Sequence, residues 1–250
     1  MDIPSLAIIF FVSIIASAFG ALIGGASIVT IPALILLGLP PHTAIGTDRF
    51  GIIGIGLAGW YKFHKKGLIK YRIGFTIAIP ILLGTILGSN LVLQISEGAL
   101  KNVIVILNIL ILIFILLNPG IGVKKQTAPL GNHKIAIGAL LSFFVGVYGG
   151  FYGALAGTFI LYILILWFRL TFIEGAATLK IASLFLSVTA ASVFSINNAV
   201  DYAFGLAMLA GCLIGSYLGS HYADRIGDVW VKRMFTVFII IAVIKLILSD

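Results

Sequence analysis

Arg49 and Lys180 are basic residues inside long apolar segments of the sequence. A lysine or arginine at the centre of a membrane-spanning helix costs about 2.5–3.5 kcal/mol on insertion scales, so its presence there predicts a function. The function we favour is anion binding. Arg49 can hold an oxyanion through two parallel N–H bonds, whereas Lys180 acts as a point charge. The alternative is a base that reaches the membrane surface, or an Arg49 neutralised by an acid.

Three further side chains flank these bases. Thr47 and Thr178 each precede a base by two residues and could donate hydroxyl hydrogens to anion oxygens. Residues i and i+2 of a helix are about 200° apart, which argues against one shared face. Asp48 opposes the positive field, so we expect it to point away from the anion or to couple transport to protons.

Two glycine-rich stretches could supply backbone groups to the same site. A helix broken inside a membrane leaves N–H groups that protein, water or a ligand must satisfy. Helix N-termini offer such groups, together with a partial positive charge, to an anion. The alternative is that small residues only permit close helix packing, which is the reading we favour for the glycines at positions 84, 88, 211, 215 and 219. The predicted anion cradle consists of Gly24, Gly25, Ala26, Ser27, Ala154, Ala156, Gly157 and Thr158.

The composition requires that these residues sit in a membrane protein. Of the 250 residues, 61% are apolar and 10% are charged, and the mean hydropathy is +1.21. Soluble domains carry roughly a quarter charged residues, so a soluble enzyme or a DNA-binding domain is excluded. The net charge of +8 comes largely from bases in short loops, where it sets topology and attracts anionic lipid rather than nucleic acid. No hydrolase, metalloprotease or nucleotide-binding motif occurs, so we expect no catalytic residue, metal or cofactor.

The chain contains an internal repeat. A shift of 131 residues aligns Thr47–Leu117 with Thr178–Leu248 without a gap, and 14 of the 71 positions are identical. The shift superposes Thr47 on Thr178 and Arg49 on Lys180. We therefore predict an all-α polytopic membrane protein with a first repeat at 1–117, a cytoplasmic linker at 118–134 and a second repeat at 135–250.

The first segment of each repeat is too long for one crossing. The 35 residues of Ser5–Leu39 would span roughly 50 Å as one helix, against a hydrocarbon core of about 30 Å. We predict that each repeat starts with two short helices in a glycine-broken hairpin, which gives ten helical segments and inverts the two halves. Twelve loop bases then face the cytoplasm and two face outward, whereas continuous spans would give nine and five. Both termini are predicted to be extracytoplasmic.

Several glycine-rich motifs occur in the order of a known membrane protein family. They are Gly24-Gly25 followed by Pro32, Gly38-Leu39-Pro40-Pro41-His42-x-Ala44-x-Gly46-Thr47, and Leu83-Gly84-x-x-Leu87-Gly88. With these motifs and the duplication, nearly the entire chain resembles the TauE/SafE family of membrane transporters. The resemblance implies transport of sulfur-containing anions such as sulfite or organosulfonates. The chain departs from the family pattern where Thr47-Asp48 and Thr178-Leu179 replace the usual Thr-Ser.

Together these observations predict a secondary transporter of small anions in the cell membrane, working by alternating access. Inverted repeats with broken helices are the recurrent plan of such transporters. The alternatives are a passive anion channel, or a membrane enzyme or structural subunit of a larger complex. The expected partners are a small anionic substrate and the lipid bilayer, and a homodimer remains an open alternative to a monomer.

Overall fold

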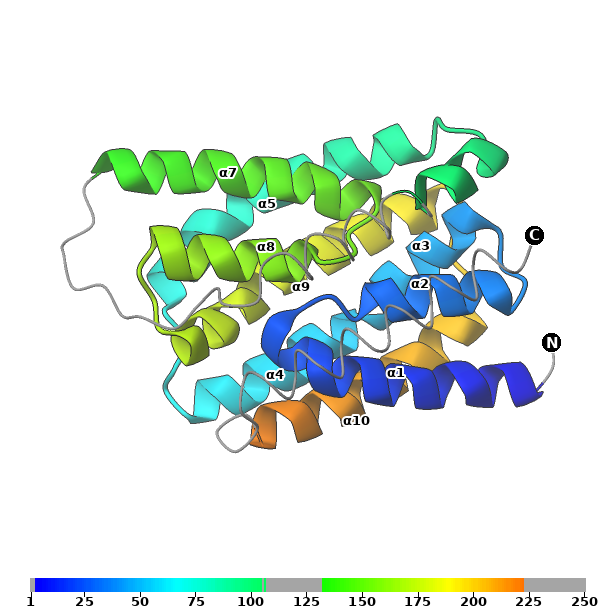
Figure 1. Ribbon diagram of the computed structural model, residues 1–250, viewed down its shortest axis with the longest axis horizontal. Coiled ribbons are helices and arrows are strands. Elements are labelled where there is room, and N and C mark those ends of the chain that lie inside the picture. The colour runs from blue at the N-terminus through cyan, green and yellow to red at the C-terminus, as the bar shows by residue number, and fades with distance from the viewer. Residues whose placement is uncertain (1–2, 105, 107–131, 223–250) are drawn as a thin grey trace.

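The computed structural model describes residues 3–104, 106 and 132–222, and every regular element within them is a helix (Figure 1). Residues 118–131 of the predicted linker at 118–134 lie outside these residues, and its last three residues belong to a helix that begins at Asn132. The apolar runs Leu100–Leu117 and Met234–Leu248 also predict spans, but most of the first and all of the second lie outside the described residues. The helices are α1 (Ile3–Ile23), α2 (Ser27–Leu36), α3 (Pro41–Gly51), α4 (Ile53–Lys65), α5 (Tyr71–Val92), α7 (Asn132–Phe151), α8 (Ala156–Tyr162) followed by a π-helix (Ile163–Trp167), α9 (Phe172–Ile196) and α10 (Tyr202–Tyr222).

The long helices have the length and surface of membrane spans. Among the described residues, four helices are long and apolar enough to cross a bilayer, namely α1, α5, α9 and α10. On α5 the exposed side chains include Phe75, Ile79 and Leu83, while Gly74 and Ile81 are buried. This helix has apolar residues outside and small or apolar ones inside, as expected where lipid replaces water.

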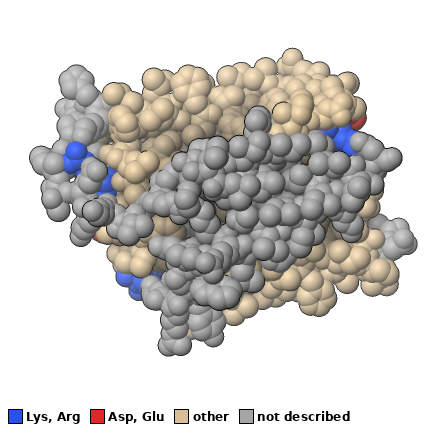
Figure 2. Space-filling model, viewed as in Figure 1, with Lys and Arg blue, Asp and Glu red and all other residues tan. Residues whose placement is uncertain are grey.

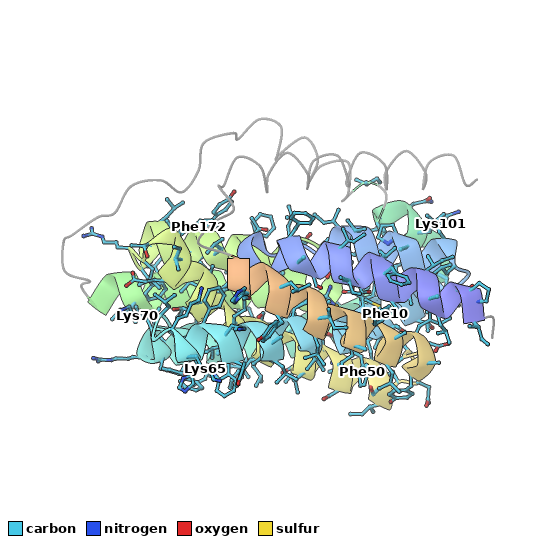
Figure 3. The ribbon with its side chains drawn as sticks, turned by 90° about the horizontal axis from the view of Figure 1, so that it is seen from below. Phe10, Phe50, Lys65, Lys70, Lys101 and Phe172 are labelled. Atoms are coloured by element: carbon cyan, nitrogen blue, oxygen red, sulfur yellow. The ribbon has the colours of Figure 1, made fainter. Side chains whose placement is uncertain are left out.

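The charged side chains on the visible surface lie at the ends of the bundle. In Figure 2, lysine and arginine atoms appear at the two ends of the long axis, and the described surface visible between them is uncharged. Figure 3 shows Lys65 and Lys70 at one end and Lys101 at the other. This distribution is the one that an apolar membrane layer flanked by two aqueous phases requires.

Glycines bring two pairs of long helices together, α1 with α10 and α5 with α7. A methyl group added at Gly88 of α5 would overlap the carbonyl oxygen of Val147 on α7. One added at Gly219 of α10 would overlap the carbonyl oxygen of Ala18 on α1. The packing interpretation of these glycine motifs is therefore confirmed, and Gly88 and Gly219 are also equivalent under the 131-residue shift.

The structure breaks both over-long segments at their glycines, but the arms are unequal. In each case the second helix runs back alongside the first (Figure 1). The prediction of two short helices is wrong for the first arms, because α1 has 21 residues and α7 has 20, about 30 Å each. The second arms are short, with 10 residues in α2 and 7 in α8 before the π-helix.

The segment that carries Arg49 is also broken. The apolar run Ala44–Tyr61 predicts one span, but α3 ends at Gly51 and α4 begins at Ile53, whereas α9 runs unbroken through the equivalent positions. Glycine in a helix interior costs about 1 kcal/mol relative to alanine. The first half has glycine at positions 51, 54, 56 and 59, where the second half has Ala182, Phe185, Ser187 and Ala190.

Helix α9 begins earlier than expected. The sequence is mixed in polarity over Leu170–Ala177 and predicts a span from Thr178, but the helix starts at Phe172. Thr171 accepts a hydrogen bond from the Glu174 backbone N–H, and the Glu174 carboxylate accepts one from the Thr171 N–H. This capping box satisfies two of the donors that a helix start leaves unpaired, and so moves the boundary toward the N-terminus.

Candidate functional site

The two helix breaks meet inside the bundle. A methyl group added at Gly24 would lie 2.7 Å from the backbone nitrogen of Thr158 and 2.7 Å from the carbonyl carbon of Gly157. Gly24 and Gly25 have φ angles of 82° and 85°, and Gly153 in the second break has 74°. This left-handed backbone favours glycine, so residue type and close approach coincide at Gly24.

A cavity of about 50 Å³ lies where the breaks meet. A cavity needs about 10–15 Å³ of such volume to hold one water, so this cavity has room for a few waters or a small oxyanion. Of the predicted cradle, Gly24, Gly25, Ala26, Ser27, Ala156 and Gly157 line it, whereas Ala154 and Thr158 do not. Among the described residues, neither Gly25 nor Ala26 donates its N–H to a backbone carbonyl. The start of α2 thus offers backbone donors at the cavity.

Arg49 lines the cavity from α3 and is 1% exposed. Its Nη2 donates to the Asp48 carboxylate at 2.7 Å, to Ser27 Oγ at 2.8 Å and to the Tyr152 carbonyl at 3.3 Å. Its Nε is buried and has no hydrogen-bond partner in the part of the chain that the structure describes. A methyl group at Gly153 would collide with the guanidinium. Arg49 therefore bridges the two breaks and keeps its Nε donor unused.

Asp48 is fully buried beside Arg49 but does not line the cavity. Its Oδ2 accepts hydrogen bonds from Ser27 Oγ at 2.8 Å and from Arg49 Nη2, and its Oδ1 accepts one from Thr30 Oγ1. The carboxylate does not line the cavity, but it binds two groups that do. Arg49 is partly neutralised by this acid.

Lys180 also lines the cavity, from α9, and is 1% exposed. A methyl group added at Gly59 of α4 would lie 2.9 Å from its Cδ and Cε atoms, so the stem packs against bare backbone. No carboxylate of the described residues lies within ion-pair distance of Lys180. The two bases and Asp48 leave this region with a net positive charge when all three are ionised.

The structure does not bring Thr47 and Thr178 to the cavity, although both are fully buried. The Thr47 hydroxyl oxygen accepts a hydrogen bond from the Asp201 N–H at 2.9 Å, just before α10. The Thr178 hydroxyl oxygen accepts one from the Lys70 N–H at 3.0 Å, just before α5. The 200° separation from the bases explains this result, because it turns the threonines toward neighbouring helices.

A match to a family model identifies the family to which this chain belongs. The model for "Sulfite exporter TauE/SafE" matches residues 9–246. This chain belongs to the TauE/SafE family. Its helices and buried bases are therefore those of a membrane transporter, as the sequence predicted.

Relatives of this TauE/SafE chain are named as transporters without a stated substrate. A "Probable membrane transporter protein" of Haemophilus influenzae is 27% identical over 247 residues, which cover 99% of this chain and 96% of that protein. The "Probable membrane transporter protein YfcA" of Escherichia coli K12 is 24% identical over 93% of this chain and 86% of its own length. YdhB of Bacillus subtilis, named in the same way, is 25% identical over 90% and 91%. No solved structure matches.

Two serines line the cavity of this TauE/SafE chain that sequence reasoning did not select. Ser183 and Ser187 follow Lys180 on α9 by three and seven residues. Residues with this spacing share one helix face, so the pattern Lys-x-x-Ser-x-x-x-Ser could have revealed them. Ser183 donates to the Lys180 carbonyl at 3.2 Å, and Ser187 is 2% exposed.

Proposed function

We propose that this protein is a secondary transporter of small anions, sulfur oxyanions or organosulfonates, that works by alternating access in the cell membrane. The observation that carries the proposal is the cavity between the two helix breaks, which both Arg49 and Lys180 line. Buried bases inside membrane helices mark substrate or ion pathways. A cavity with more basic than acidic groups favours an anion over a cation.

The donors around the cavity suit an oxyanion. Arg49 Nε has no hydrogen-bond partner among the described residues, and the N–H groups of Gly25 and Ala26 donate to no backbone carbonyl there. Lys180 adds a point charge, and the start of α2 adds the positive end of its dipole. Sulfite, with three oxygens around one sulfur, is small enough for a cavity of about 50 Å³. The description of the family as sulfite exporters supports the same substrate class.

We further propose that the two halves are inverted repeats. Reciprocal contacts support this relation. Thr47 of the first half binds the backbone N–H of Asp201, and Thr178 of the second half binds that of Lys70. Lys70 and Asp201 are themselves equivalent under the 131-residue shift. An inverted pair places the termini outside the cell and puts Lys66 and Asn198 on opposite faces of the membrane. Labelling of single cysteines at these two positions from one side of the membrane would test this topology.

Flux measurements on purified protein test the transport function. Proteoliposomes are given labelled sulfite, sulfate or methanesulfonate under imposed proton, sodium and voltage gradients. We expect saturable uptake of at least one of these anions, stimulated by the same unlabelled anion inside the vesicle. Flux without saturation or exchange would indicate a passive channel instead, and no anion flux at all would refute the proposal.

A matched pair of variants separates the site from the scaffold. Lys180→Gln removes a cavity charge, whereas Lys65→Gln removes a charge from the exposed end of α4. We expect Lys180→Gln to weaken anion uptake at least tenfold and Lys65→Gln to leave it within about twofold. Equal uptake by both variants would remove Lys180 from the proposed site.

A further inference from the structure

Asp48 occupies the groups that an incoming anion would use. Ser27 and Arg49 line the cavity, and both donate to the same carboxylate oxygen of Asp48. Ser27 has one hydroxyl hydrogen, which Asp48 takes at 2.8 Å. The two hydrogens of Arg49 Nη2 already face three acceptors. An anion can gain these donors only if the carboxylate gives them up.

A second negative charge next to Asp48 is also unfavourable. Asp48 is fully buried, and like charges close together in a buried site disfavour each other's ionised form. The nearest compensating charge is Arg49, which Asp48 already uses. A proton on Asp48 would remove the repulsion and release the donors together.

Other titratable groups lie near this pair, but no other carboxylate of the described residues there competes with the anion for donors. Lys180 and Arg49 are bases and favour the anion directly. Cys212 of α10 is within electrostatic range of Asp48, and Tyr148 of α7 is within range of Arg49, but both are neutral donors in their ordinary state. On α2 the neighbours of Asp48 are the hydroxyl groups of Ser27 and Thr30.

We propose that Asp48 takes up one proton as an anion enters the cavity and releases it as the anion leaves, which rests on the anion transport proposed above. The proton comes from a hydronium ion of the aqueous phase to which the cavity is open and adds to a carboxylate oxygen, and the new O–H donates to the Thr30 hydroxyl oxygen. Ser27 Oγ–H and Arg49 Nη2–H then turn to the anion. The site carries the same net charge empty and loaded with a monovalent anion, so each such anion is transported with one proton.

The repeat supports a single coupling group and suggests the variants. The position equivalent to Asp48 in the second half is Leu179, so one half carries the carboxylate and the other does not. Asp48→Asn keeps the size and the acceptor oxygen but cannot titrate in this range. Glu97→Gln removes a carboxylate that lies outside the cavity, bonded to His42, and serves as the matched control.

The test follows anion and proton movement together in proteoliposomes that contain a pH-sensitive dye, with the voltage held at zero by potassium and valinomycin. The probe is methanesulfonate, which has one charge at every working pH. We expect wild type and Glu97→Gln to take up about one proton per anion and to accumulate the anion when protons are driven inward. Asp48→Asn should keep anion exchange within about threefold and lose proton-driven accumulation at least tenfold.

Two results would overturn the coupling role while leaving anion transport intact. One is wild-type uptake without proton movement, which decides the matter even if Asp48→Asn fails to fold. The other is proton-driven accumulation by Asp48→Asn at the wild-type level. If wild type moves none of methanesulfonate, sulfite or sulfate, the anion transport itself is refuted, and the coupling with it.

Discussion

The contact between the two helix breaks can be tested at Gly24. A methyl group there would lie 2.7 Å from two backbone atoms of the second break, and Gly24 has a φ of 82°. Gly38 provides a matched control, because its φ is 96° but nothing lies within 4 Å of an added methyl group. Gly24→Ala and Gly38→Ala therefore share backbone strain and differ in the collision.

The expected magnitudes follow from these two terms. A left-handed conformation costs an alanine roughly 1–2 kcal/mol, which applies to both variants. Overpacking against a neighbour that cannot move freely adds about 1–3 kcal/mol, which applies to Gly24→Ala alone. Gly157→Ala isolates the contact, because its added methyl group would lie 3.0 Å from the Gly24 Cα atom in an ordinary helical backbone.

Thermal unfolding in detergent and anion uptake in liposomes measure the effect. For a protein of this size, 1 kcal/mol shifts the midpoint by roughly 2–4 °C, so Gly24→Ala should melt about 2–12 °C below Gly38→Ala. It should also lose uptake, because separating the breaks deforms the cavity. Equal melting temperatures and equal uptake for Gly24→Ala and Gly38→Ala would refute the close approach of the two breaks.

Three further predictions concern buried polar groups. Arg49→Gln leaves Asp48 buried without its cation and should cost about 3–5 kcal/mol of stability, and adding Asp48→Asn should restore much of the melting temperature but not uptake. Lys180→Gln removes no ion pair of the described residues, so the midpoint of thermal unfolding should change by less than for Arg49→Gln. The affinity for the anion should nevertheless fall, and an unchanged affinity would contradict the role of Lys180. Thr47→Val and Thr178→Val each leave one backbone N–H unpaired, at about 1–3 kcal/mol, with little change in affinity. A tenfold loss of affinity in either threonine variant would instead place its hydroxyl at the anion.

Much of the site could be predicted because its determinants are local. The positive-φ glycines at 24 and 25 stand in an apolar run too long for one crossing, and a break there follows from length alone. Arg49 and Lys180 were recognisable because a base inside an apolar segment is costly wherever the segment packs. The unequal hairpin arms were missed, since hydropathy does not say where along a continuous apolar run the chain turns.

The partners of each polar group could not be read from the sequence. Asp48 could have pointed away or paired with Arg49, and both choices fit the same helix. In the structure Asp48 pairs with Arg49 and does not line the cavity. Its other donors are the hydroxyl groups of Ser27 and Thr30, which belong to a different helix. Ser183 and Ser187 could have been found by helical spacing, but only once the face carrying Lys180 was known to line a cavity.

The sequence by itself determined that this protein is a helical membrane protein with a duplicated plan, two glycine breaks and two buried bases. Hydropathy, helical spacing and repeat similarity depend on neighbouring residues or on direct comparison along the chain. Only the tertiary structure decided that Gly24 meets Gly157, that Arg49 and Lys180 share one cavity, and that the two threonines bind backbone of the opposite half. Those facts join residues more than a hundred positions apart, and they follow from how whole helices pack, which no local pattern specifies.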